Sequence, residues 1–127
     1  MGKVHFDAYK SIPGVKVVAA SDVDIENARK RLNDPDVAFY TDLDLMLEKE
    51  NLDIIDICTP TYLHAEHAVK SLNKGIHTIC EKPISLTVDK AQEIVDAAKK
   101  NNVFFMVAQV IRFWPEYVYL KKAYDEG

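Results

Sequence analysis

The sequence contains no apolar run close to the roughly 18 residues that a membrane-spanning helix needs, so no membrane partner is expected. The first ten residues, MGKVHFDAYK, lack the apolar stretch of a signal peptide, which favours a cytoplasmic protein. The 16 basic and 20 acidic residues are mixed along the chain, without the basic patch that nucleic-acid binding needs. The two cysteines, Cys58 and Cys80, do not support a disulfide framework, and we expect both to be reduced.

The 127 residues, 48% of them hydrophobic, indicate one globular domain. Short β-branched runs alternate with helical patterns, as in a parallel α/β sheet. Strands are predicted at 15–20, 38–40, 54–58, 77–80 and 103–107, and helices at 4–11, 25–32, 42–50, 63–74, 88–101 and 115–127. In the helix capped by Thr87, the residues expected to face inward are Val88, Ala91, Ile94, Val95 and Ala98. The pattern predicts a doubly wound α/β fold that begins with a helix, where such a sheet has its central first strand.

Ligands of open parallel sheets bind beyond the carboxyl ends of the strands, where this sequence places several polar residues. Asp22 follows the strand at 15–20, and such an acid binds the ribose hydroxyls of a dinucleotide. Gly2 lies 20 residues earlier and suits the last glycine of a pyrophosphate-binding loop. From spacing alone, Asp22 and Asp24 could equally do no more than cap the next helix.

Two further strand ends carry candidate residues. The Thr59-Pro60 turn could hold a ligand contact, although proline there is also ordinary punctuation after a strand. Lys82 lies at the end of the strand 77–80, where its ammonium could bind a ribose or substrate oxygen or move a proton. Its neighbour Glu81 is expected to hold that ammonium. From spacing alone, a solvated ion pair explains this pair of residues at least as well.

His64 and His67 lie three residues apart on one predicted helix, and Cys58 or Cys80 could join them around a metal ion. A zinc site needs three or four converging ligands, and this spacing matches no known finger, so no metal is expected. The position of His64 in the first turn favours helix capping or a cofactor contact, and His5 is expected to be structural.

Taken together, the motifs resemble the glucose–fructose oxidoreductase / inositol 2-dehydrogenase / rhizopine catabolism family. The resemblance covers nearly the whole chain and rests on the order and spacing of MGKVHFDAY, PGVKVVAASDVD, DIIDICTP followed by His64, GIHTICEKP and VAQVIRFWPEY. It implies a Rossmann-like domain that binds NAD, with NADP possible, in a dehydrogenase acting on a carbohydrate-like substrate: a sugar, polyol or related secondary alcohol.

The resemblance also implies roles for individual residues. Asp22 would bind the adenosine ribose and favour NAD, a preference that Arg29 or Lys30 could soften. Lys82 would hold the nicotinamide ribose and reach the substrate hydroxyl as the catalytic residue, and Pro83 would set a turn that often contains a cis peptide. Arg112 would lie near the substrate. The other implied cofactor-binding residues are Thr59, Pro60, His64, Glu81 and Gln109.

The sequence departs from the family pattern at its start, where Gly2 alone remains of the three glycines expected after a first strand. Residues 1–127 are therefore expected to form a shortened NAD(P)-binding domain, with the catalytic substrate domain outside this chain. Such a chain is not expected to turn over substrate alone, and the full-length form is expected to be a homo-oligomer. The alternative is a non-catalytic, cofactor-sensing regulatory relative.

Overall fold

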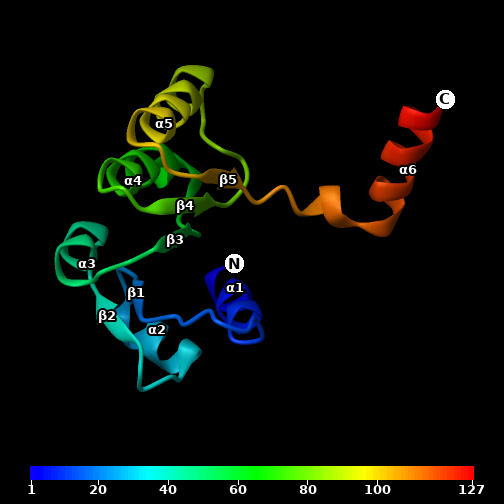
Figure 1. Cartoon of the computed structure of the whole chain (residues 1–127). Helices are drawn as coiled ribbons and strands as arrows, with labels where there is room; N and C mark the ends of the chain where they lie inside the picture. Colours follow the sequence, from blue (N-terminus) through cyan, green and yellow to red (C-terminus); the bar gives the residue numbers. More distant parts are fainter.

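The computed structural model describes all 127 residues as an α/β domain with a helix extending from it (Figure 1). Helices and strands alternate along the chain, as the sequence predicts. The elements are α1 (Gly2–Tyr9), β1 (Ala19–Ser21), α2 (Ile25–Leu32), β2 (Ala38–Tyr40), α3 (Leu43–Lys49), β3 (Ile54–Ile57), α4 (Thr61–Asn73), β4 (His77–Cys80), α5 (Val88–Asn101), β5 (Phe105–Val107), the 3-10 helix η1 (Val110–Phe113) and α6 (Pro115–Glu126).

The strands form two separate parallel sheets, β1-β2 and β3-β4-β5. Strands β1 and β3 therefore each keep one edge without backbone pairing. The doubly wound pattern predicts its central first strand at this break, so the expectation of a sheet lacking that strand is confirmed. The break also explains why β1 is shorter than the predicted strand at 15–20, since its only partner, β2, begins at Ala38.

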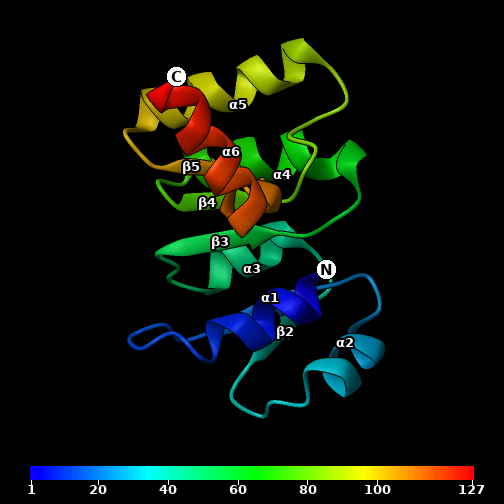
Figure 2. The ribbon, with the colours of Figure 1, turned by 90° about the vertical axis from the view of Figure 1, so that its right-hand side faces the viewer.

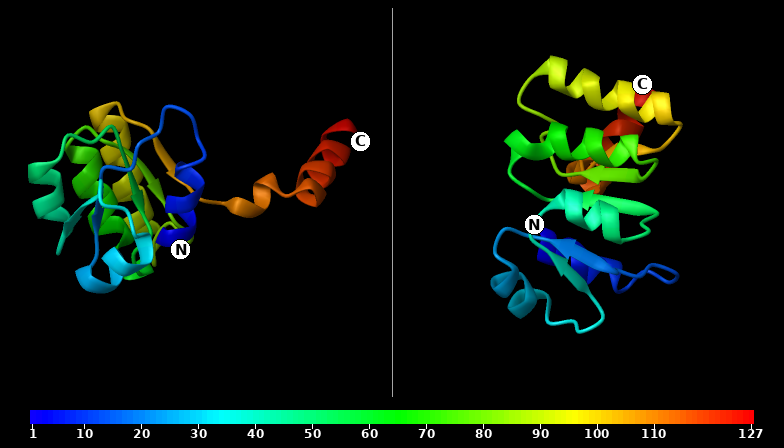
Figure 3. Two further views of the ribbon diagram at one scale, coloured as in Figure 1. Left: turned by 90° about the horizontal axis from the view of Figure 1, so that it is seen from below. Right: turned by 90° about the vertical axis from the view of Figure 1, so that its left-hand side faces the viewer.

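Helices cover both faces of the strands. Helices α3, α4 and α5 lie on one side, and α1 lies on the other (Figures 2 and 3). The doubly wound arrangement is thus confirmed. Helix α6 extends away from the sheets and has no buried residue (Figure 1). None of the helices combines the length and the apolar character that crossing a bilayer requires.

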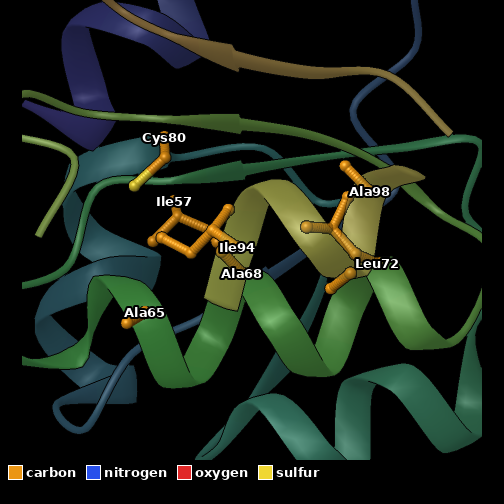
Figure 4. Close-up of a cluster of buried hydrophobic side chains, with 8 residues drawn as sticks. Ile57, Ala65, Ala68, Leu72, Cys80, Ile94 and Ala98 are labelled. Atoms are coloured by element: carbon orange, nitrogen blue, oxygen red, sulfur yellow. The ribbon is translucent and has the colours of Figure 1, made fainter. Parts of the chain in front are cut away.

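The main core lies between the three-stranded sheet and the helices α4 and α5 (Figure 4). Leu72 and Ile94 are completely buried there and pack with Ile57 and Cys80. A second cluster joins α3 to β3 through Leu43, Met46, Leu47, Ile55 and Ile76. Helix α3 also packs on β1 and β2, so it connects the two sheets where backbone pairing does not.

The caps predicted at Asp24 and Thr87 are confirmed, because each accepts a backbone hydrogen bond at the start of its helix, and Asp42 does the same for α3. The expectation that Val88 faces inward is wrong. Val88 is 84% exposed and Ala97 is buried instead, because the buried side chains of α5 belong to its later turns, from Ile94 to Ala98.

The unpaired edges of β1 and β3 predict self-association of the purified chain, because strand edges pair readily with other chains. We expect the sedimentation coefficient to rise with protein concentration. Ile54→Lys, which places a charge on the edge strand β3, should reduce this rise. Val88→Lys, on the exposed start of α5, is the matched control. A wild-type monomer at every concentration would contradict the prediction.

Candidate functional site

Asp22, Thr59, Lys82 and Gln109, all candidate ligand contacts, follow parallel strands, so each lies at the carboxyl end of its sheet. Asp22 follows β1, and Thr59 follows β3. Lys82 follows β4, and Gln109 follows β5. The structure therefore places the predicted residues at the end of the sheets where doubly wound folds bind ligands.

Asp22 is exposed and is held by the turn that follows β1. Its Oδ1 accepts the backbone N–H of Asp24 at 2.9 Å, while the second oxygen has no protein partner. Asp24, not Asp22, caps α2 by accepting from Asn27 N at 3.0 Å. Two roles left open by the sequence are thus separated: one aspartate begins the helix, and the other presents a carboxylate oxygen to solvent. The guanidinium of Arg29, expected to modulate cofactor choice, stacks on Phe39 with its carbon 4.7 Å from the ring centroid.

Gly2 is the first residue of α1, and this end of the helix is open to an anion. Met1 occupies the N-cap position without a side-chain hydrogen bond, and no acidic residue lies in the first turn. A Cβ on Gly2 would lie 3.8 Å from Cys58 Cβ, an ordinary contact, so glycine is not required there by close packing. The free backbone N–H groups and the helix dipole suit a pyrophosphate.

The expected ion pair between Glu81 and Lys82 does not form. Glu81 is buried, and its Oε1 lies 3.1 Å from His5 Nε2 on α1. Its Oε2 accepts the backbone N–H of Lys82 at 3.0 Å. That expectation was wrong because His5, on α1, and the backbone N–H of Lys82 take up the two oxygens of Glu81. The exposed ammonium of Lys82 consequently has no protein partner, and the Lys82-Pro83 peptide is cis, as the resemblance implies.

His64 is almost completely buried, with 1% of its surface exposed. Its Nδ1 lies 2.8 Å from Pro83 O, and its Nε2 lies 2.8 Å from Thr59 O. The ring thus connects the turns after β3 and β4, and neither nitrogen is free for a metal ion. This geometry favours an indirect role, while a direct contact with the cofactor stays a prediction. His67 is half-buried, which lowers its pKa, and its Nδ1 lies 3.4 Å from Thr59 Oγ1.

The remaining predicted site residues are Pro60, Gln109 and Arg112. Pro60 is the N-cap residue of α4 and therefore helps to begin that helix. Gln109 precedes η1, and Arg112 lies within it. Both side chains are exposed and make no side-chain hydrogen bond or ion pair, so their expected positions near the nicotinamide and the substrate stay predictions.

Sequence reasoning missed a polar network beneath α1. Asp56 Oδ2 on β3 lies 2.7 Å from His5 Nδ1 and accepts from Tyr9 OH at 2.8 Å. Burial, with the negative charge of Asp56, raises the pKa of the Tyr9 hydroxyl, and burial with the same charge raises the pKa of Cys58 to about 12. The four-residue spacing of His5 and Tyr9, which places both on one helix face, and the single acid within the apolar strand were the available signals.

Comparisons with known proteins agree with this arrangement. The family model described as "Oxidoreductase family, NAD-binding Rossmann fold" (GFO_IDH_MocA) matches residues 1–109. A 2,7-anhydro-N-acetylneuraminate hydratase of Mediterraneibacter gnavus is 32% identical over 93% of this chain and 31% of its own length. A levoglucosan dehydrogenase of Pseudarthrobacter phenanthrenivorans is 31% identical over 100% of this chain and 35% of its own length.

Among solved structures, the myo-inositol 2-dehydrogenase of Lactobacillus plantarum superposes with a TM-score of 0.86 at 33% identity. The match covers 99% of this chain and 38% of that protein. This chain thus spans about a third of the length of the relatives it matches.

Proposed function

The chain belongs to the GFO_IDH_MocA family of oxidoreductases with an NAD-binding Rossmann fold, and from this we propose that residues 1–127 are the cofactor-binding part of a dehydrogenase. Its substrate would be a sugar, polyol or related secondary alcohol. The observation that carries the proposal is the placement of Asp22, Thr59 and Lys82 at the carboxyl ends of parallel strands. The relatives named as a levoglucosan dehydrogenase and a myo-inositol 2-dehydrogenase support this class of substrate.

The residues fit the chemical groups of NAD. The free oxygen of Asp22 would accept hydrogen bonds from the adenosine ribose and repel the 2′-phosphate of NADP. The N-terminus of α1, at Gly2, would bind the pyrophosphate, and the turn at Thr59 and Pro60 would line the path towards the nicotinamide. When bound, the cofactor supplies or accepts the hydride.

Lys82 is the residue we assign to the substrate oxygen. Because Glu81 is occupied by His5, the Lys82 ammonium is available to hold the nicotinamide ribose and to orient and polarise the carbinol or carbonyl oxygen. Glu81 would act by fixing the backbone N–H of Lys82. Gln109 and Arg112 would lie at the nicotinamide and the mouth of the substrate site.

The complete protein would work in the cytoplasm as a homo-oligomer, without a nucleic-acid partner. The catalytic acid or base that completes proton transfer would come from a substrate domain beyond residue 127, as the greater length of the relatives suggests. The chain alone would then bind cofactor without turning over substrate.

Asp22 gives the first test of cofactor binding. In a protein extended to the length of its relatives, Asp22→Ala should weaken NAD binding by about 10- to 100-fold, because hydrogen bonds to a charged acceptor contribute about 1.5–3 kcal/mol. Loss of the carboxylate should also strengthen NADP binding, because repulsion of the 2′-phosphate disappears. Calorimetric titration with both cofactors measures the two effects.

Asp36→Ala is the matched control, because Asp36 is also exposed but lies on the loop before β2. It should leave both affinities unchanged. If Asp22→Ala has the same affinities as the wild type, or if the extended wild type binds neither cofactor, the assignment of Asp22 is wrong.

A further inference from the structure

The polar network beneath α1 contains three kinds of metal ligand at short range. His5 Nδ1 lies 3.4 Å from Cys58 Sγ and 2.7 Å from Asp56 Oδ2, and Cys58 Sγ lies 3.8 Å from Asp56 Oδ1. All three ligand atoms fall within 4.8 Å of one another, and the three residues are partly buried. They come from a helix and the end of a strand that pack together, so the cluster is held by the fold.

The charge of the cluster favours a cation. Asp56 and Glu81 both contact His5, and neither carboxylate pairs with a lysine or arginine. The Met1 ammonium acts on Cys58 from nearby but pairs with neither carboxylate, so Asp56 and Glu81 have no salt-bridge partner other than the His5 ring. Tyr9 adds a hydrogen bond to Asp56 but no positive charge.

The distances suit a tetrahedral ion. Bonds of about 2.3 Å to sulfur and about 2.0–2.2 Å to nitrogen or oxygen place tetrahedral zinc ligands roughly 3.4–3.6 Å apart. The 3.4 Å between His5 Nδ1 and Cys58 Sγ already lies in this range. Asp56 Oδ1 lies 3.8 Å from Cys58 Sγ, whereas the other oxygen, Oδ2, lies 2.7 Å from His5 Nδ1, so the carboxylate would have to turn to place one oxygen at a suitable distance from both ligands. Glu81, on the other ring nitrogen of His5, supplies the carboxylate partner that commonly orients a metal-binding histidine.

We propose that His5, Asp56 and Cys58 form a Zn²⁺ site, with water as the fourth ligand. On loading, the Cys58 thiol proton and any proton on His5 Nδ1 pass to solvent, the new bonds join the ion to sulfur, nitrogen and oxygen, and no oxidation occurs. The site differs from the combination of His64, His67 and a cysteine weighed from the sequence. It does not depend on the proposed dehydrogenase function, although it would fix Glu81 and, through it, the backbone of Lys82.

The test uses the metal-stripped 127-residue chain, Zn²⁺ for stoichiometry and Co²⁺ as an optical probe. We expect one Zn²⁺ per chain after dialysis and a near-ultraviolet thiolate-to-Co²⁺ charge-transfer band. Cys58→Ala should remove the band, whereas Cys80→Ala should retain it, which makes the two cysteines a matched pair. Glu81→Gln should keep the band but lower Zn²⁺ affinity about 10- to 100-fold, because the orienting carboxylate is lost.

A second readout uses the wild-type chain and so does not depend on how the variants fold. Zn²⁺ should slow alkylation of Cys58, mapped by mass spectrometry, and the fully buried Cys80 provides the internal reference. Absence of retained Zn²⁺, a band that persists in Cys58→Ala, or no protection of Cys58 would overturn the proposal. His5 would then serve only to connect Asp56 and Glu81 through its two ring nitrogens.

Discussion

Replacing Lys82 with alanine, in a protein extended to the length of its relatives, should lower turnover of a sugar or polyol by about 100- to 10,000-fold, the usual range for losing a proton-transfer group. Lys82 is exposed at the end of β4, and its ammonium has no protein partner because Glu81 is bound by His5. We expect kcat to fall much more than NAD affinity, because the substrate oxygen loses its polarising cation in the transition state.

Two variants make this test specific. Lys100→Ala, an exposed lysine in the last turn of α5, should leave kcat unchanged. Lys82→Arg keeps the positive charge but cannot release a proton, so it should recover substrate binding more than turnover if Lys82 transfers a proton. Unchanged kinetics in Lys82→Ala would refute its role. NAD binding without turnover in the extended wild type would favour the cofactor-sensing alternative.

Local sequence signals predicted most of the fold. Apolar periodicity located every strand, and capping residues such as Asp24 and Thr87 fixed where α2 and α5 begin. The errors arose where a neighbouring element decides the outcome. β1 is short because only β2 pairs with it, and Val88 is exposed because the core contacts of α5 lie in its later turns.

In the candidate site, too, features set by local sequence could be predicted, whereas features set by contacts between distant segments could not. Strand ends can be read from the sequence, so the positions of Asp22, Thr59 and Lys82 could be predicted. The partner of Glu81 could not, because His5 lies 76 positions earlier and reaches it only when α1 packs on the sheet. His64 was recognised as a residue of interest, but its burial between two backbone carbonyls depends on turns that are distant from each other in the sequence.

Replacing His64 with leucine should lower the free energy of unfolding by about 2–4 kcal/mol, because two buried carbonyl oxygens lose the imidazole between them. The turn that contains Thr59 and the turn that contains Lys82 and Pro83 would then no longer be joined. We therefore expect NAD affinity to fall as well, even at temperatures where the variant remains folded. Denaturant unfolding and calorimetry in the extended protein measure the two effects.

His67→Leu is the matched control, since it removes a half-buried histidine from the same helix and only a 3.4 Å contact with Thr59. Its effect on both measurements should be small. His64→Gln separates packing from hydrogen bonding, because a single amide can donate to one of the two carbonyls and should recover part of the stability. If His64→Leu unfolds like the wild type and binds NAD equally well, the imidazole does not couple the two turns. The positions of Thr59 and Lys82 would then be set by their own strands alone.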